Sequence, residues 1–365
     1  MEALPVLCGM PLAELAERLR PEPRFRAAQV FAWIARGARS FDEMSDLPAP
    51  LRARLAGSFL LRPQAAEQRL SDPDGSAKLA LEFSDGRRAE AVLLSDSGSD
   101  GGRPRFTACL STQAGCPCAC VFCKTGSIGF KRNLGADEIV EQFLRLKSLA
   151  LEKIGDSRGE ARPVSNIVVM GMGEPLLNLD ALSRALAVIC DRQGENLSRR
   201  RICVSTCGLP AGIRALADGG LMAKPRAAPL ARLALSLTTG DEELRRRLMP
   251  FTRAYPLSEV KEALRYFQAR GGGRVTLEAA LLRGINLREK DALETAKFAR
   301  GIDAQINLIP WNPVKGLEFE GRALATPTPA EAAAYARRLR ELGLAVTGRF
   351  RRARGIMGAC GQLGE

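Results

Sequence analysis

The sequence predicts an α/β fold built on a parallel sheet, with a smaller helical and β-hairpin module ahead of it. Strand-like and helical segments alternate from residue 105 to residue 350, and consecutive parallel strands need a helix between them. The 365 residues are 46% hydrophobic and 26% charged, so the chain is globular and long enough to bury a sizeable core. Six or seven strand–helix units suit either a doubly wound sheet or an open barrel.

The N-terminal module comes first along the chain. Residues 10–57 show helical periodicity interrupted by prolines, and two strand-like runs joined by a Ser-Asp-Gly turn follow at Lys78–Phe83 and Arg88–Leu94. A loop rich in Gly, Ser and Asp separates these runs from the alternating region at residues 95–104. We therefore expect a helical accessory domain, a β-hairpin extension with its linker, a core and a C-terminal tail, at residues 1–57, 58–104, 105–350 and 351–365.

The alternating region supplies the parallel sheet. Its predicted strands are Arg105–Leu110, Asn166–Gly171, Arg201–Ser205, Arg232–Leu237, Arg274–Leu281, Gln305–Ile309 and Ala345–Phe350. Its predicted helices are Ala136–Lys147, Leu179–Asp191, Leu209–Ala217, Leu257–Gln268, Arg288–Arg300 and Pro329–Leu342. Because both candidate architectures bind ligands at the carboxyl ends of their strands, side chains at those ends are the first candidates for function.

Composition excludes several kinds of site. The chain has no histidine, which rules out an imidazole zinc site, a Ser-His-Asp triad and a His general base. The net charge of +13 predicts a nucleic acid partner, unless the excess only reflects an Arg-rich genome. No segment reaches the about 18 apolar residues of a membrane span, and the start lacks a signal peptide, so we expect a cytoplasmic protein without a membrane partner.

The ten cysteines carry the most information, since thiols in a reducing compartment are metal ligands or reactive groups more often than disulfides. Cys116, Cys120 and Cys123 form a C-x3-C-x2-C pattern directly after the first strand of the core. Three thiolates leave one iron of a 4Fe-4S cluster open to an outside chelator. The alternatives are a closed cluster with Cys118 or Cys109 as the fourth ligand, and zinc.

A second motif follows the next strand and reads Gly171-Met-Gly-Glu-Pro-Leu-Leu-Asn178. Such a turn exposes backbone groups and one carboxylate, which suit the amino group of a bound amino acid. Alone, the motif also fits an ordinary turn at the end of a strand. Beside a three-cysteine cluster loop it indicates S-adenosylmethionine (SAM), whose amino and carboxyl groups can chelate the open iron.

Together these motifs strongly resemble the radical SAM RNA methyltransferases of the RlmN/Cfr family. Besides the cluster loop, the similar blocks are Phe25–Phe31, Ser40–Met44, Lys131–Leu134, Gly171–Asn178, Val204–Thr206, Ile306–Pro313 and Ala359–Leu363. They occur in order over nearly the whole chain. The resemblance implies a radical SAM partial (β/α)6 barrel, preceded by a small helical and β-hairpin domain that contacts RNA.

The resemblance also implies the cofactors and their ligands. Cys116, Cys120 and Cys123 would hold a 4Fe-4S cluster. The positions that match the SAM contacts of the family are Gly173, Glu174, Ser205, Ser236, Leu237, Thr238 and Asn312. Ser205 and Ser236 also suit simple turn or capping chemistry, and Thr238 stands where family members usually carry His.

The same resemblance implies a route for the methyl group. In the family, the C-terminal thiol, here Cys360, is first methylated by one SAM, and the radical from a second SAM then removes a hydrogen from that S-methyl group. The resulting carbon radical adds to adenine, after which Cys109 would attack the Cys360 sulfur and leave a transient disulfide. Glu90 matches the proton acceptor of the family, and its alternative is an exposed strand carboxylate.

The other cysteines have no assigned role in this scheme, whereas the basic groups fit contacts with RNA. Cys190 and Cys203 fit core positions, whereas Cys118 lies inside the cluster loop and could compete for iron or for the disulfide. The basic groups, each of which could be a solvated face or a phosphate contact, are Lys131–Arg132, Arg199–Arg201, Arg245–Arg247, and Arg349, Arg351, Arg352 and Arg354.

Three functions remain open from the sequence. The first is methylation of adenine carbon 2 in 23S ribosomal RNA, with tRNA as a further substrate and a flavodoxin-type protein as electron donor. The second is methylation of carbon 8, as in the Cfr branch of the family. The third is a non-catalytic iron-sulfur or zinc protein that binds RNA.

Overall fold

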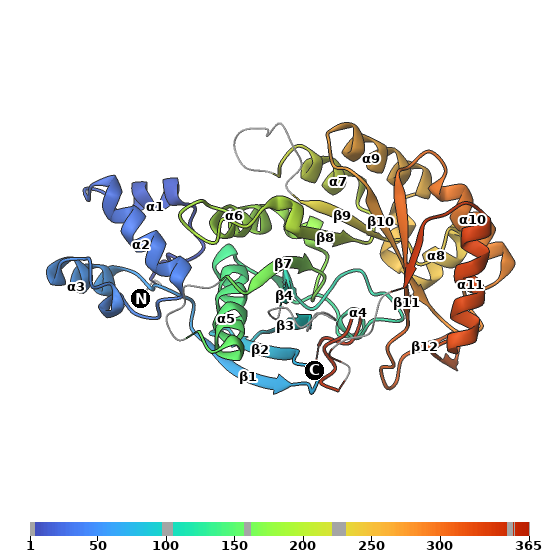
Figure 1. Cartoon of the computed structure of the whole chain (residues 1–365), viewed down its shortest axis with the longest axis horizontal. Helices are drawn as coiled ribbons and strands as arrows, with labels where there is room; N and C mark the ends of the chain where they lie inside the picture. Colours follow the sequence, from blue (N-terminus) through green and yellow to red (C-terminus); the bar gives the residue numbers. More distant parts are fainter. Residues whose placement is uncertain are drawn as a thin grey trace.

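The structure is a computed structural model that describes residues 4–96, 105–156, 162–220, 231–348, 353 and 355–364. Ten of its strands form one sheet in the order β1-β2-β3-β4-β7-β8-β9-β10-β11-β14, and helices surround the larger part of it (Figure 1). The predicted α/β class with an N-terminal helical module is confirmed.

The N-terminal module consists of helices α1 (Leu12–Arg18), α2 (Arg24–Arg36) and α3 (Ala49–Ser58) with the 3₁₀ turn η1 (Phe41–Glu43). Helix α2 buries Val30, Phe31 and Ile34 on one face and ends at Gly37, whose φ of 97° suits glycine. Each of those fully buried apolar side chains contributes about 1.5–3 kcal/mol to folding. The module packs on the core at Gly9, where any side chain would clash with the backbone of Asp137.

Three antiparallel strands connect this module to the barrel: β1 (Ala65–Ser71), β2 (Ala77–Phe83) and β3 (Arg88–Asp96). The sequence predicted β2 and β3 but missed β1, because six of its seven residues are exposed and give no alternating pattern. Strand β3 also pairs with β4, so the hairpin extension and the barrel share one sheet. The division of the chain into four units stays a prediction, and its boundary at residue 104 separates two paired strands.

The parallel strands are β4 (Arg105–Cys109), β7 (Val164–Val169), β8 (Ile202–Thr206), β9 (Arg232–Ser236), β10 (Val275–Leu281), β11 (Ala304–Pro310) and β14 (Val346–Gly348). Their spatial order follows the chain order without a reversal. Since parallel crossovers are right-handed, this order places all the crossover helices on one face, whereas a doubly wound sheet reverses its order. The fold is therefore the open barrel.

The helices of the core are α5 (Ala136–Ile154), α6 (Leu179–Ile189), α7 (Pro210–Ala217), α8 (Glu242–Leu248), α9 (Leu257–Ala269), α10 (Glu289–Ala299) and α11 (Pro329–Glu341). All but α8 were predicted. The remaining short elements are α4 (Lys124–Ser127), η2 (Pro175–Asn178), η3 (Arg199–Arg201), η4 (Pro250–Ala254), and the strand pairs β5 (Gln113–Ala114) with β6 (Arg132–Asn133) and β12 (Glu318–Phe319) with β13 (Arg322–Ala323). Among the described residues, no helix is both long and apolar enough to cross a membrane.

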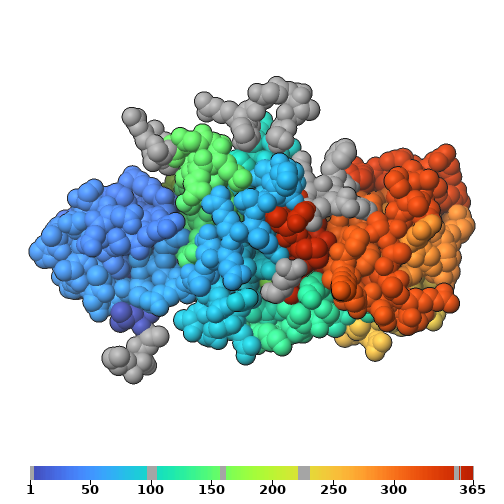
Figure 2. Space-filling view, turned by 90° about the horizontal axis from the view of Figure 1, so that it is seen from below, coloured from blue at the N-terminus to red at the C-terminus, as the bar shows by residue number. Residues whose placement is uncertain are grey.

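The C-terminal tail lies between the N-terminal strands and the last elements of the barrel (Figure 2). Its residues Ala353, Ile356 and Leu363 form an apolar cluster with Val92 of β3 and Cys109 of β4. The tail therefore fills the side of the barrel at which β4 and β14 do not pair.

Candidate active site

The cluster loop connects β4 to α5 and carries Cys116, Cys120 and Cys123. Its two ends are held together by the β5–β6 pair, and Gly115 has a φ of 75° at a point where a side chain would meet the carbonyl of Gly129. Helix α8 supports the loop, since the Val121 amide donates a 3.0 Å hydrogen bond to the Leu248 carbonyl. All three cysteines line one cavity of about 170 Å³ at the carboxyl ends of the strands.

The electrostatics of these thiols suit a metal cluster. Burial raises the pKa of Cys120 well above its usual value and raises that of Cys123 in the same direction. A hydrogen bond from the Cys118 thiol lowers the pKa of Cys116. Buried thiolates without a cation are unfavourable, so the charge of bound iron would be what keeps Cys120 and Cys123 ionised.

Glu174 lines the same cavity and comes directly after Gly173, which lies close to Gln113. Its amide donates to Gln113 Oε1 at 2.9 Å, and its carboxylate accepts the amides of Leu176 at 3.1 Å and Cys207 at 2.7 Å. Burial raises the pKa of Glu174, although these hydrogen bonds oppose the change. The carboxylate is thereby fixed in place and faces the cluster loop.

Three further predicted SAM contacts lie at the ends of neighbouring strands. Ser205 belongs to β8 and Ser236 ends β9, and their hydroxyl oxygens are 3.3 Å apart on the cavity wall. Neither serine caps a helix, because Leu209 and Asp241 take those positions. Thr238, with a φ of 61°, also lines the cavity. The side chain of Leu237 does not, since it is buried in the core and leaves only its backbone near the site.

Asn312 supplies the strongest sign that a ligand belongs here. Its side chain is only 4% exposed, and its Nδ2 donates to the Cys360 carbonyl at 3.0 Å. Its Oδ1 is buried without a hydrogen-bond partner among the described residues. A buried acceptor of this kind costs about 1–3 kcal/mol unless a donor reaches it, and a SAM molecule in this cavity would carry such donors.

Arg245 corrects one expectation. The sequence placed the Arg245–Arg247 run among the exposed basic groups, but Arg245 is only 1% exposed. Its guanidinium donates to the carbonyls of Leu237, Cys207 and Ser236. These hydrogen bonds fix the backbone at the cavity wall. Arg246 and Arg247 do reach the surface, where each pairs with a glutamate. Helix α8, which the sequence analysis missed, is what turns Arg245 inward.

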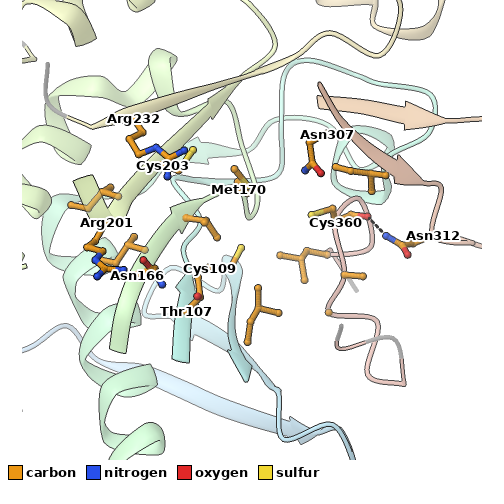
Figure 3. A pocket seen from close by; sticks show the side chains of 18 of the residues that line it. Thr107, Cys109, Asn166, Met170, Arg201, Cys203, Arg232, Asn307, Asn312 and Cys360 are labelled. Carbon is orange, nitrogen blue, oxygen red and sulfur yellow. Dashed lines mark hydrogen bonds between the residues drawn. The ribbon is translucent and has the colours of Figure 1, made fainter. Parts of the chain in front are cut away.

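Cys360 is shared by two cavities, of which Figure 3 shows the larger one. It lines the cavity of the cluster cysteines and also a larger one of about 460 Å³ inside the barrel. The tail around it is fixed by the Asn312 contact, by the Lys124 amide donating to the Gly361 carbonyl at 2.8 Å, and by the Thr125 hydroxyl donating to the Leu363 carbonyl at 2.6 Å.

Cys109 and Cys360 line the larger cavity together, although they lie far apart in the chain (Figure 3). Neither forms a disulfide, and the other eight cysteines do not either. Cys203 lines this cavity too rather than the core, while Cys190 packs against the core. The structure thus brings together the two thiols for which the resemblance implied a shared reaction.

Glu90 does not line either cavity. It is 2% exposed, so the alternative of an exposed carboxylate is wrong. Its Oε2 accepts the Gly364 amide of the tail at 3.0 Å, and its Oε1 lies 3.4 Å from Lys78 Nζ. Sequence reasoning overlooked Lys78, which alternates with Leu79 and Leu81 and therefore looks like part of a polar strand face, although it is buried in the structure.

Three arginines stand at the amino ends of β8 and β9, at the far end of the larger cavity from Cys360. They are Arg200, Arg201 and Arg232, and each is exposed. None of them pairs with a carboxylate in the part of the chain that the structure describes. By contrast, Arg132 forms ion pairs with Asp85 and Glu138. The predicted basic residues Arg349, Arg351, Arg352 and Arg354 lie outside the described residues.

Comparison with known proteins agrees with this geometry. Residues 110–296 match the model of the radical SAM superfamily, and residues 7–61 match that of the ribosomal RNA large subunit methyltransferase N-terminal domain. The protein of Treponema pallidum (strain Nichols) named "Probable dual-specificity RNA methyltransferase RlmN" is 46% identical over all of this chain and 99% of its own.

The chain belongs to the RlmN family of radical SAM RNA methyltransferases. A dual-specificity RNA methyltransferase RlmN of Nitratidesulfovibrio vulgaris (strain DP4) is 38% identical over 94% of this chain and 89% of its own. The crystal structure of a radical SAM methyltransferase from Sphaerobacter thermophilus superposes with a TM-score of 0.86 at 36% identity, covering 98% of both chains. Members of this family use a 4Fe-4S cluster and SAM, which the three-thiol loop and the Asn312 acceptor fit.

Proposed function

We propose that this RlmN family member methylates carbon 2 of an adenine in 23S ribosomal RNA and also acts on tRNA, through a methyl group carried on Cys360. The observation that supports this most is the position of Cys360, which lines both the cavity of the cluster cysteines and the cavity of Cys109. A thiol that must first accept a methyl group and then present it to a base needs access to two compartments.

The cofactors would be held by the residues of the smaller cavity. Cys116, Cys120 and Cys123 bind the cluster, and Glu174 and Asn312 offer acceptors to the amino group of SAM. When bound, the cluster and SAM supply the methyl group and a 5′-deoxyadenosyl radical. The protein contributes position, because Asn312 holds the Cys360 backbone at the boundary between cofactor and substrate.

Cys109 and Glu90 would complete the reaction. Once the carbon on Cys360 has given up one hydrogen atom and joined the base, the adduct would have to lose one electron, which a bound cluster could accept, and the ring proton, which Glu90 would accept. The Cys109 thiolate would then form a bond to the Cys360 sulfur as the sulfur–carbon bond breaks, and the freed carbon would take up a proton to become the methyl group of the released base. A disulfide remains for a dithiol to reduce. Since Glu90 is bound to the Gly364 amide, this end of the tail has to move before the carboxylate can reach a base.

RNA would approach from the amino ends of the strands. The opposite end is covered by the cluster loop and α8, whereas Arg200, Arg201 and Arg232 line the amino end of the cavity without carboxylate partners among the described residues. Guanidinium groups bind phosphates well, and an adenine taken out of its stack could then enter toward Cys360. A flavodoxin-type protein as electron donor and a cytoplasmic location complete the proposal.

Nucleoside mass spectrometry tests the function directly. RNA from cells with the gene should contain 2-methyladenosine in 23S ribosomal RNA and tRNA, and RNA from cells without it should lack that modification. Formation of 8-methyladenosine would assign the protein to the carbon-8 branch, and RNA without any change would refute the proposal. Purified protein with a reconstituted cluster, SAM and a flavodoxin reducing system should reproduce the product on ribosomal RNA transcripts.

A further inference from the structure

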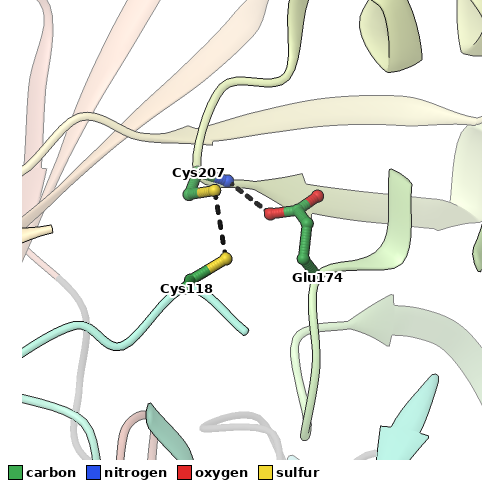
Figure 4. Close-up of side chains that lie close together, drawn as sticks. All are labelled: Cys118, Glu174 and Cys207. Carbon is green, nitrogen blue, oxygen red and sulfur yellow. Dashed lines mark hydrogen bonds between the residues drawn. The ribbon is translucent and has the colours of Figure 1, made fainter. Parts of the chain in front are cut away.

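Two buried thiols that the methylation reaction does not use lie in the wall of the cofactor cavity (Figure 4). Cys118 and Cys207 are separated by 89 residues in the chain, yet their sulfur atoms are 3.3 Å apart. The carboxylate of Glu174 completes a group of three potential ligand atoms that all lie within 4.8 Å of one another. All three residues are buried.

The chain holds these groups in place through hydrogen bonds that leave the sulfur atoms facing each other. The Cys207 amide donates to Glu174 at 2.7 Å, and the Cys207 carbonyl accepts Arg245 at 2.5 Å. On the cluster loop, the Cys118 amide lies 3.5 Å from Cys116 Sγ. The two thiols therefore come from separate segments of the chain. In each segment, hydrogen bonds made by the backbone of the cysteine hold it in place.

Two thiols and one carboxylate form a typical donor set for a thiophilic cation. Zn²⁺ takes Cys and Glu ligands in tetrahedral geometry and accepts water as the fourth ligand, whereas Mg²⁺ and Ca²⁺ prefer oxygen ligands alone. We propose that Cys118, Cys207 and Glu174 form a binding site for a thiophilic divalent cation such as Zn²⁺, separate from the three-cysteine cluster site.

The site has a consequence for the cofactor, which rests on the proposed function. Glu174 is also the carboxylate expected to accept a hydrogen bond from the amino group of SAM. The same carboxylate cannot fully coordinate a cation and bind SAM at the same time. Binding of the cation and binding of SAM should therefore weaken each other by the same factor, because coupling between two ligands is reciprocal. A thiophilic cation would thus act as an inhibitor that competes with SAM.

Cobalt titration of the full chain tests the site without any reaction. In reduced, anaerobic protein carrying Cys116→Ala, Cys120→Ala and Cys123→Ala, Co²⁺ should bind once per chain with a thiolate-to-cobalt absorption band, and Zn²⁺ should remove that band. Adding Cys118→Ala or Cys207→Ala should weaken Co²⁺ binding by more than about 10-fold. Loss of a group that only hydrogen-bonds to a metal ligand already costs about 10-fold, and loss of a ligand itself should cost more. Cys190→Ala, which removes a thiol elsewhere, should change nothing. Equal binding with and without Cys118 and Cys207 would overturn the proposal.

Two further measurements keep the test decisive. If the triple variant does not fold, as shown by circular dichroism, the same titration is done on iron-free wild-type protein and on its Cys118→Ser and Cys207→Ser variants. In cluster-loaded protein, Zn²⁺ should raise the apparent Kd for SAM in the wild type but not in Cys118→Ser, with iron content unchanged. Loss of iron, or an unchanged Kd, would overturn the proposal. Failure of SAM to bind without Zn²⁺ would count against the proposed function instead.

Discussion

The two cavities that meet at Cys360 are built differently. In the smaller one, the carboxylate of Glu174 and the strand-end carbonyls already have hydrogen-bond partners within the protein, and Arg245 supports them from below. In the larger one, the arginines at the mouth have no carboxylate partners in the described part of the chain. The difference indicates that the smaller cavity is preorganised for its ligands, whereas the arginines of the larger cavity remain available to bind a polyanion.

Removing the sulfur that joins the two cavities should have the largest effect. Cys360→Ala should lower RNA methylation by more than about 10⁴-fold, because a covalent carrier is removed rather than weakened. Mass spectrometry of the intact protein after incubation with SAM should show a methylated wild type and an unmethylated variant. Cys190→Ala is the matched control, and a variant that still transferred methyl groups to RNA would show that the junction is not used.

Removal of the Cys109 thiol should allow the carbon to join the RNA but prevent release of the product. Cys109→Ala leaves the cofactor cavity intact, so the methyl carbon should still join the RNA, but the link to Cys360 should not be resolved. We expect product to fall by at least about 100-fold and a protein–RNA adduct to appear on a denaturing gel. Normal turnover without an adduct would exclude Cys109 from the reaction.

RNA binding at the arginines of the larger cavity should depend on salt concentration, whereas SAM binding in the smaller cavity should not. The double variant Arg201→Ala with Arg232→Ala should weaken RNA binding by about 10-fold or more for each guanidinium–phosphate hydrogen bond removed. The slope of log K against log salt should become shallower by about 0.7–0.9 for each phosphate that is no longer neutralised. SAM binding should be unchanged. Arg337→Ala, on the outer helix α11, is the control, and an equal effect there would show only a general charge contribution.

The docking of the tail on the N-terminal strands should give the smallest effect. The Asp74 carboxylate accepts the Ala353 amide at 2.9 Å, and Asp72 accepts the Gly355 amide at 2.8 Å. Burial acts to raise the pKa of Asp74, but the hydrogen bonds from Ala353 and Ser76 outweigh it and lower the pKa below its ordinary value. Asp74→Ala should therefore weaken docking of the tail by about 1 kcal/mol at neutral pH.

The pH dependence of that docking follows from the direction of the shift. A carboxyl group with a lowered pKa in the folded state stabilises it above the ordinary pKa, and the contribution disappears as the pH falls through the lowered value. Hydrogen exchange should therefore show a protected Ala353 amide at neutral pH and a loss of its protection below about pH 4. In Asp74→Ala the protection of Ala353 should be weaker and independent of pH in this range. A wild-type-like profile in the variant would show that Asp74 does not hold the tail.

Local signals in the sequence identified most of the strands and both cofactor motifs. Apolar runs marked β7 through β11. The resemblance to the family named Glu174, Ser205 and Ser236, which lie at the strand ends where the sheet argument also expected a ligand. The predictions failed where long-range packing decides the outcome. Strand β1 has a polar sequence and forms only because β2 offers it an edge, and Arg245 is buried because α8 turns it inward. No pattern along the chain pairs Cys118 with Cys207, since only the closure of the loop onto β8 brings them together.

The sheet that runs from β1 to β14 without a break also determines how the enzyme can be taken apart. Strands β2 and β3 carry Lys78 and Glu90, and the β1–β2 turn carries the two aspartates that hold the tail. A truncated protein that begins at the first barrel strand would keep the three cysteines proposed to bind iron and yet lose the contacts that align Cys360, the proposed methyl carrier. The barrel alone is therefore not a minimal catalyst, and chimaeras between relatives should exchange the N-terminal strands together with the tail.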